Sequence, residues 1–148
     1  MAELMFNSIL VVCTGNICRS PIGERYLRTL LPNKKIDSAG TGALVGHVAD
    51  DSAVNISSIH GISLNGHVAR QFTSSIARQY DLILVMEKVH MEEIGRIAPE
   101  ARGKTMLFGY WLSHREIPDP YRKSDEAFSS VFELIVQAGS LWAEKLGV

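Results

Sequence analysis

Short, unbroken runs of apolar residues alternate with stretches of helical periodicity along this 148-residue chain, and this alternation constrains the fold more than any other feature. Such runs are typical of strands that are buried on both faces of a parallel sheet. Strands that alternate with helices form a sheet whose two faces are covered by those helices. We therefore predict an α/β fold in a single domain, residues 1–148, with strands at 8–12, 35–39, 81–86 and 104–108.

The stretches between these runs, and the one after the last, place apolar residues on one helix face. Ser20 and Pro21 begin the first of them, with Ser20 as the N-cap and Pro21 in the first turn. Gly61 is a typical residue to end the second. The predicted helices cover residues 20–31, 52–60, 89–97 and 124–146.

Parallel sheets bind ligands at the carboxyl ends of their strands, which directs attention to the loop after the first strand. This loop reads Cys-Thr-Gly-Asn-Ile-Cys-Arg-Ser-Pro over residues 13–21. A loop that leads straight into a helix presents backbone N–H groups and the positive end of the helix dipole to an anion. Gly15 and Asn16 tolerate the left-handed backbone angles that such a cradle requires. We therefore predict a phosphate-binding loop between the first strand and the first helix.

Two side chains add chemistry to this anion site. Arg19 can grip two phosphate oxygens at once with its planar guanidinium. Cys13 at the start of the loop would lie under the phosphorus as a nucleophile, since the groups that bind a dianion also stabilise a thiolate. Ser20 can donate a hydrogen bond to that thiolate. The substrate-binding residues of the loop are predicted to be Thr14, Gly15, Asn16, Ile17, Cys18 and Ser20.

Each of these residues has a plainer explanation when it is taken alone. Cys13 would be an inert buried thiol and Arg19 a surface charge, but their order between a strand and a helix favours catalysis. A nucleotide-binding P-loop is excluded because it needs Gly-Lys-Ser or Gly-Lys-Thr at the helix start. Cys18 either packs in the loop or forms a reversible disulfide with Cys13 that protects the nucleophile.

A thiolate that displaces an alkoxide or phenolate from phosphorus benefits from a proton donor on a facing loop. Asp119 is the best candidate, because Pro118 and Pro120 restrict the backbone around it and aim its carboxylate. Tyr121 follows directly and can stack on an aromatic substrate ring. In isolation the Asp-Pro pair would indicate only a turn, but together with the Cys13 loop it indicates a general acid.

These two motifs resemble those of the low-molecular-weight protein tyrosine phosphatases, in particular the bacterial branch associated with exopolysaccharide and capsule production. The resemblance extends from residue 7 to residue 124. It implies a four-stranded parallel sheet, a phosphocysteine at Cys13, and an Asp119 that acts first as acid and then as base. It also implies that Leu44 and Tyr121 form the pocket walls and that no cofactor takes part.

The resemblance further implies that Asn16 braces the loop and that the substrate is an autophosphorylated bacterial tyrosine kinase that drives polymer export. Three alternatives remain. A protein-arginine phosphatase on the same scaffold carries Thr where this chain has Ile17, whose bulk favours a tyrosine ester. An arsenate reductase requires two further cysteines, and none follows Cys18. A non-catalytic phosphate-binding module would be expected to lack Cys13, Arg19 or Asp119, and all three are present.

Charge and composition argue against several kinds of binding partner for this chain. The net charge of −1 gives no general attraction to nucleic acid or to an anionic membrane. No run approaches the ~20 apolar residues that span a bilayer, and the first seven residues lack the features of a secretory signal. The five histidines show no metal-ligand spacing, so we expect no metal. A cytoplasmic enzyme is therefore expected, and we also expect it to be a monomer.

Overall fold

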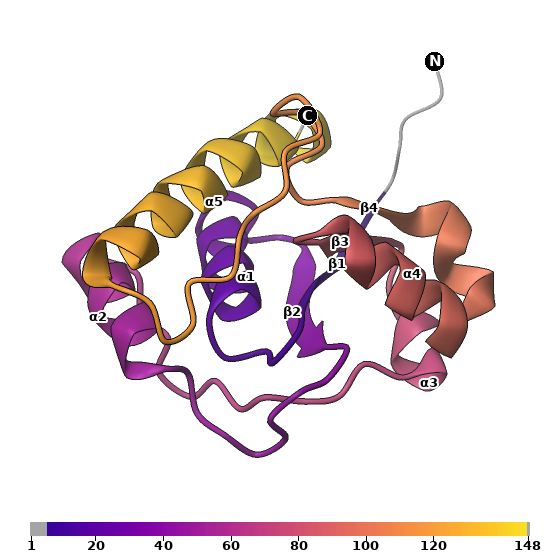
Figure 1. The fold of residues 1–148 in the computed structure, drawn as a ribbon. Coiled ribbons are helices and arrows are strands. Elements are labelled where there is room, and N and C mark those ends of the chain that lie inside the picture. Colours follow the sequence, from indigo (N-terminus) through magenta and orange to yellow (C-terminus); the bar gives the residue numbers. More distant parts are fainter. Residues whose placement is uncertain (1–5, 148) are drawn as a thin grey trace.

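A central sheet with helices on both sides organises the computed structural model, which describes residues 6–147 (Figure 1). The sheet is parallel throughout, and its strands lie in the order β2-β1-β3-β4. In this register Val12 lies opposite Ala39 on one side and Val85 on the other. The predicted α/β fold with a four-stranded parallel sheet is confirmed. The strands are β1 (Ser8–Cys13), β2 (Lys35–Gly40), β3 (Leu82–Val85) and β4 (Thr105–Leu107).

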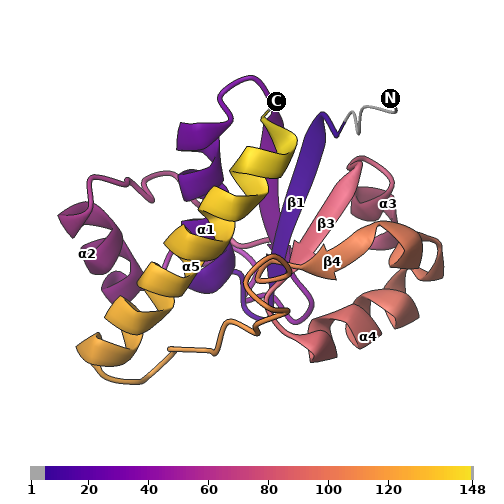
Figure 2. The same ribbon diagram turned by 90° about the horizontal axis from the view of Figure 1, so that it is seen from above.

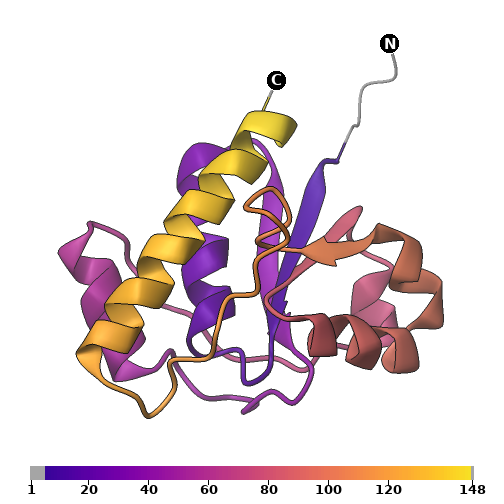
Figure 3. The same cartoon turned by 45° about the horizontal axis from the view of Figure 1, so that its top comes forward.

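The helices divide between the two faces of the sheet (Figure 2 and Figure 3). One face is covered by α1 (Arg19–Leu30), α2 (Asp51–Ile59) and α5 (Asp125–Leu146), with α1 packed against both of the others. The other face is covered by α3 (Ser74–Ala77), α4 (Lys88–Ile97) and the 3₁₀ helix η1 (Pro99–Lys104).

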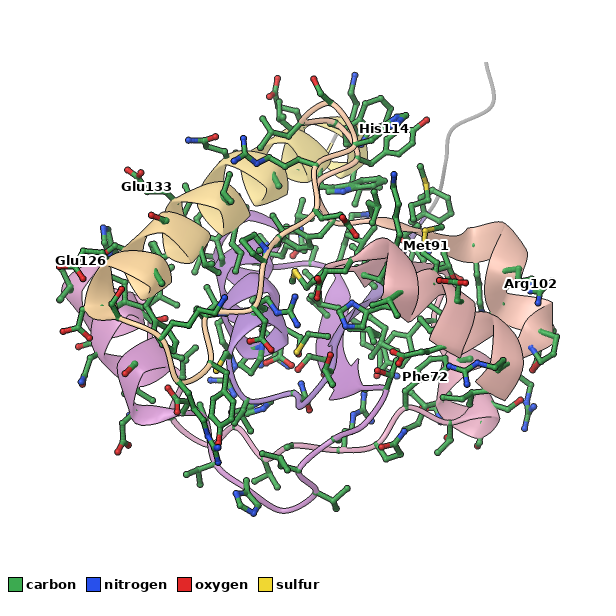
Figure 4. All side chains as sticks on the ribbon, viewed as in Figure 1. Phe72, Met91, Arg102, His114, Glu126 and Glu133 are labelled. Carbon is green, nitrogen blue, oxygen red and sulfur yellow. The ribbon has the colours of Figure 1, made fainter. Side chains whose placement is uncertain are left out.

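Alternate residues of β1 enter the two cores on either side of the sheet. Ile9 and Val11 belong to the core beneath α1 and α5, whereas Leu10 and Val12 belong to the core beneath α3 and α4. All four are fully buried, which explains why the run is apolar at every position rather than at every second one. On the α5 surface, the labelled Glu126 and Glu133 point outward, while Phe72 lies in the opposite core (Figure 4).

Several element boundaries differ from the prediction. The first helix begins at Arg19 with Cys18 as its N-cap, so the N-cap assignment of Ser20 was wrong. The Ser20 hydroxyl does not cap the helix. It contacts Cys13 and Asn16 in the segment before the helix instead. The short α3 and η1 were not predicted, and β3 and β4 are shorter than the apolar runs that contain them. Gly61 follows α2 with φ of 77°, as expected of a residue that ends a helix.

The first strand ends at Cys13, and the chain segments that follow all the strands meet at this one edge of the sheet. The loop 14–18 follows β1, the loop 41–50 follows β2, Glu87 follows β3, and the long connection 108–124 follows β4. Parallel strands place their carboxyl ends together, so residues that are far apart in the sequence become neighbours here.

Two expectations concern residues beyond the described range. The domain prediction of 1–148 includes residues 1–5 and 148, and the expected lack of a secretory signal concerns residues 1–7, so both lie partly outside the described residues. Within residues 6–147, no helix has the length and apolar character that crossing a membrane requires.

Gly40 at the end of β2 gives a test of how closely the phosphate loop is packed. A Cβ at this position would stand 2.2 Å from the Thr14 carbonyl oxygen and 3.1 Å from the Asn16 nitrogen. We predict that Gly40→Ala lowers the free energy of unfolding by about 1–3 kcal/mol, because the backbone of the loop must move. Urea denaturation measures this loss.

Gly103→Ala is the matched control, since a Cβ there would meet no described heavy atom within 4 Å. Equal stability of the two variants would show that the contact between β2 and the loop is not tight.

Candidate active site

A cavity of ≈ 200 Å³ opens at this edge of the sheet, over the loop that joins β1 to α1. It brings together Cys13, Arg19 and Asp119, the three residues predicted to carry catalysis. Of the predicted substrate-binding residues, Asn16 and Ser20 lie behind the lining and are fully buried. The complete lining consists of Cys13, Thr14, Gly15, Ile17, Cys18, Arg19, Gly42, Leu44, Asp119 and Tyr121.

The Cys13 thiol lies at the base of the cavity, with its sulfur 2.9 Å from Ser20 Oγ. Asn16 Nδ2 donates a hydrogen bond of 2.8 Å to the same Ser20 oxygen. Because that oxygen already accepts from Asn16, the Ser20 hydrogen is available for the Cys13 sulfur. The Ser20 hydroxyl is therefore placed to donate to the Cys13 sulfur.

Asn16 makes the hydrogen bonds that connect the loop to the surrounding protein. It adopts a left-handed conformation with φ of 60°, whereas Gly15 lies outside the left-handed region, so only one of the two residues predicted to need positive φ has it. The Asn16 amide nitrogen also donates to Ser38 Oγ at 3.0 Å, and its oxygen accepts from the Arg70 backbone N–H at 2.9 Å. Its backbone carbonyl contacts His67 Nε2 at 2.6 Å. These bonds use every polar group of a fully buried side chain.

A carboxylate continues this network away from the cavity. Ser38 Oγ, which accepts from Asn16, donates to Glu24 Oε1 at 2.8 Å. The second oxygen of Glu24 pairs with Arg25 Nε at 2.7 Å. Glu24 is only 4% exposed, so its charge is both paired and hydrogen-bonded as a buried charge requires.

Arg19 is held rigidly although it faces a cavity. Its Nη1 donates to Glu87 Oε1 at 2.7 Å and to the Ile117 carbonyl at 2.8 Å, and the side chain is 2% exposed. Its Nη2 lies 3.8 Å from Asp119 Oδ2. One edge of the guanidinium is therefore occupied by protein oxygens, while the rest of the group is left for the cavity.

Asp119 and the two predicted walls form the rim. The Asp119 side chain is 50% exposed, and its Oδ1 accepts the Tyr121 backbone N–H at 3.0 Å, which fixes the carboxylate direction. Arg122 Cζ lies 5.2 Å from the centre of the Tyr121 ring. Leu44, on the opposite loop, is tied to the phosphate loop by its N–H, which donates to the Gly15 carbonyl at 3.0 Å.

Cys18 lines the same cavity as Cys13 but has a different environment. Both cysteines are buried free thiols. Burial, reinforced by the Asp50 carboxylate, raises the pKa of Cys18 well above its usual range, which keeps this thiol protonated. A disulfide between Cys13 and Cys18 stays a prediction.

The residues that support the catalytic side chains were mostly missed from the sequence. Glu87 was not singled out as the partner of Arg19, nor were His67 and Glu24 assigned to the network behind the loop. Glu87 carried a usable signal, because it stands two residues beyond a buried parallel strand and so lies near the ligand-binding edge. Across residues 6–147, no group of three or more His, Cys, Asp or Glu side chains is placed to hold a metal ion.

Comparison with known proteins decides the family. The sequence pattern described as "Low molecular weight phosphotyrosine protein phosphatase" matches residues 8–147. The chain belongs to the low molecular weight protein-tyrosine-phosphatase family. The resemblance seen in the two motifs is thereby confirmed, and the enzyme class is that of protein-tyrosine-phosphatases.

Relatives of this phosphatase match over nearly their full length. The low molecular weight protein-tyrosine-phosphatase Etp of Escherichia coli K12 is 58% identical over 146 residues, which cover 99% of each chain. The crystal structure of the tyrosine phosphatase Wzb from Escherichia coli K30 in complex with sulphate has a TM-score of 0.95 and 68% identity, covering 97% of this chain and 100% of Wzb. The arginine phosphatase YwlE of Geobacillus stearothermophilus has a TM-score of 0.88 at 30% identity, covering 95% of this chain and 92% of YwlE.

His67 should make the stability of the phosphatase depend on pH. Burial lowers the pKa of His67 below its ordinary value of 6.5, so the unfolded chain binds a proton first as the pH falls. The free energy of unfolding is therefore expected to decrease from pH 6.5 downward until the folded-state pKa is passed. Urea denaturation at about pH 7.5 and about pH 5.5 would measure the decrease.

The variant His67→Gln should weaken this pH dependence, because its amide can still donate to the Asn16 carbonyl but does not titrate. His47→Gln changes an exposed histidine and serves as the control. An unchanged slope in His67→Gln would assign the acid sensitivity to other groups.

Proposed function

We propose that this phosphatase hydrolyses phosphotyrosine in proteins through a phosphocysteine intermediate on Cys13. The observation that supports this most strongly is the convergence of a thiol, a buried guanidinium and a half-exposed carboxylate on one cavity. Arg19 would bind the phosphate, and Asp119 would transfer protons. A non-catalytic phosphate-binding module would need the guanidinium but neither the thiol nor the carboxylate beside it.

In the first step the Cys13 thiolate attacks phosphorus, an S–P bond forms, and the bond from phosphorus to the tyrosine oxygen breaks. The departing phenolate takes a proton from Asp119, whose exposed carboxyl group faces the cavity. Arg19 neutralises the oxygens of the transferring phosphoryl group with the part of its guanidinium that Glu87 and Ile117 leave free.

In the second step the Asp119 carboxylate accepts a proton from water as the water oxygen attacks phosphorus. The S–P bond then breaks, inorganic phosphate leaves, and the sulfur carries away the electron pair. The Ser20 hydroxyl, 2.9 Å from the sulfur, is suited to stabilise the departing thiolate.

The cavity walls favour an aryl phosphate over other esters. Ile17 and Leu44 supply apolar surface, and Tyr121 supplies an aromatic ring beside Asp119. The similarity to YwlE keeps phosphoarginine as the alternative substrate, and the bulk of Ile17 argues against it.

The wider setting rests on the family. Similarity to Wzb and Etp supports an autophosphorylated bacterial tyrosine kinase of exopolysaccharide or capsule production as the substrate protein. We place the enzyme in the cytoplasm as a monomer whose one phosphatase domain spans residues 1–148.

Cys13→Ser tests the nucleophile. We expect loss of turnover by a factor of at least about 10³ with inorganic phosphate still bound, because the loop donors and Arg19 remain. Phosphate binding by calorimetry and hydrolysis of an aryl phosphate would be measured on the same preparation. Retained turnover would refute the phosphocysteine, and loss of phosphate binding in a folded variant would mean that the loop is not the anion site.

A peptide panel tests the substrate and the acid together. With a chelator present, the enzyme should hydrolyse a phosphotyrosyl peptide but neither phosphoseryl nor phosphoarginyl peptides. Asp119→Asn should reduce hydrolysis of the phosphotyrosyl peptide by about 10²–10⁴, but hydrolysis of an aryl ester with a highly acidic leaving group much less. Hydrolysis of phosphoarginine would favour the alternative function, and equal losses for both leaving groups would exclude Asp119 as the proton donor.

A further inference from the structure

His90 is a fully buried histidine near the start of α4, outside the cavity lining. Both of its ring nitrogens make hydrogen bonds. Nδ1 accepts the Glu87 backbone N–H at 3.0 Å, and Nε2 lies 2.9 Å from Thr14 Oγ1. Its two partners belong to different parts of the active site, because Thr14 follows the nucleophile and Glu87 holds Arg19.

The hydrogen bonds fix the tautomer of the ring. Since Nδ1 accepts from a backbone N–H, the proton of the neutral ring must be on Nε2, which donates to Thr14 Oγ1. The hydroxyl of Thr14 is then free to donate its own hydrogen elsewhere. A neutral imidazole satisfies both partners, whereas a doubly protonated one would face the Glu87 N–H with a second donor.

His90 also constrains the residue that orients Arg19. At the start of α4 the His90 ring accepts the Glu87 backbone N–H, and the His90 backbone N–H donates to the Glu87 carbonyl oxygen at 3.0 Å. The Glu87 carboxylate accepts Arg19 Nη1 at 2.7 Å. The His90 ring therefore joins Glu87, which holds Arg19, to Thr14 in the loop that carries Cys13.

We propose that His90 is a positioning residue that couples the Arg19 clamp to the loop carrying Cys13, acting through Glu87 on one side and Thr14 on the other. The loss of phosphate affinity that we expect when this link is broken follows from the geometry. Any loss of turnover rests in addition on the proposed function.

The charges around the ring agree with a neutral His90. Burial, and next the Arg19 guanidinium, lower the pKa of His90, while the carboxylates of Glu87, Glu93 and Asp119 oppose this. Protonation of the ring would remove the acceptor of the Glu87 N–H, so the coupling is expected to persist at neutral pH and to fail in acid.

Two substitutions separate the two halves of the link. In His90→Asn the amide oxygen lies near the position of Nδ1 and can still accept the Glu87 N–H, but the side chain is too short to reach Thr14. In His90→Gln the amide nitrogen lies near the position of Nε2 and can still donate to Thr14. Thr14→Val removes the hydroxyl with little change of shape and completes the comparison.

The experiment measures the affinity for inorganic phosphate by calorimetry near neutral pH, with thermal unfolding of each variant alongside. His90→Asn and Thr14→Val are each expected to weaken phosphate binding about fivefold, the effect of one hydrogen bond. The double variant should be no weaker than either single variant, because both remove the same bond. His90→Gln keeps the Thr14 half of the link but loses the Glu87 half, so it should also weaken phosphate binding. His60→Gln, which changes the histidine directly after α2, should match the unmodified enzyme.

Unchanged phosphate affinity in His90→Asn, with only a lower unfolding temperature, would overturn the proposal and leave His90 as a core residue. Additive losses in the double variant would overturn it as well, because Thr14 would then act on phosphate directly. Since the readout is binding, a failure of the proposed hydrolysis would leave this comparison intact.

Discussion

The buried amide of Asn16 is the constraint on which the rest of the site depends. Its nitrogen joins Ser20 to Ser38, and its oxygen ties the loop to the Arg70 backbone. Leaving a buried polar group without its hydrogen-bond partner costs about 1–3 kcal/mol of folding free energy, so breaking any one of these bonds is unfavourable. The left-handed φ of 60° would be strained in isolation and persists because the surrounding bonds determine it. The loop is therefore held in one shape by bonds from the protein itself.

The parallel sheet brings residues that are distant in the sequence together at one edge. Cys13, Gly40 and Glu87 stand at or just beyond the ends of three neighbouring strands, and Asp119 lies on the connection that follows the fourth. The close fit between Gly40 and the carbonyl of Thr14 shows that β2 is part of the site and not only of the scaffold. Secondary structure thus determines which distant residues meet, and side-chain bonds determine how they are oriented.

The parts of the site that could be predicted from the sequence are those whose residues lie close together in the chain. Cys13 and Arg19 could be singled out because they share one short loop between a strand and a helix, and Asp119 because two prolines flank it. The structure brings these three residues to one cavity. Glu87 could be placed at the ligand-binding edge by the strand before it. Its pairing with Arg19 and the contacts of His90 could not be predicted, since they depend on how α4 packs against the loop, and no local pattern encodes that packing. Ser20 was misassigned as a cap for a related reason, because its hydroxyl is used by tertiary partners rather than by its own helix.

The rigidity of Arg19 has a consequence for the product of the reaction. The conformational entropy of this long side chain is lost when the protein folds, because Glu87 and the Ile117 carbonyl hold it in place. In the proposed mechanism a phosphate dianion would meet a clamp that needs no further ordering, whether it arrives on a protein or as free phosphate. The same ordering would then favour the product as much as the substrate, so inorganic phosphate is expected to compete with the phosphoprotein for this site.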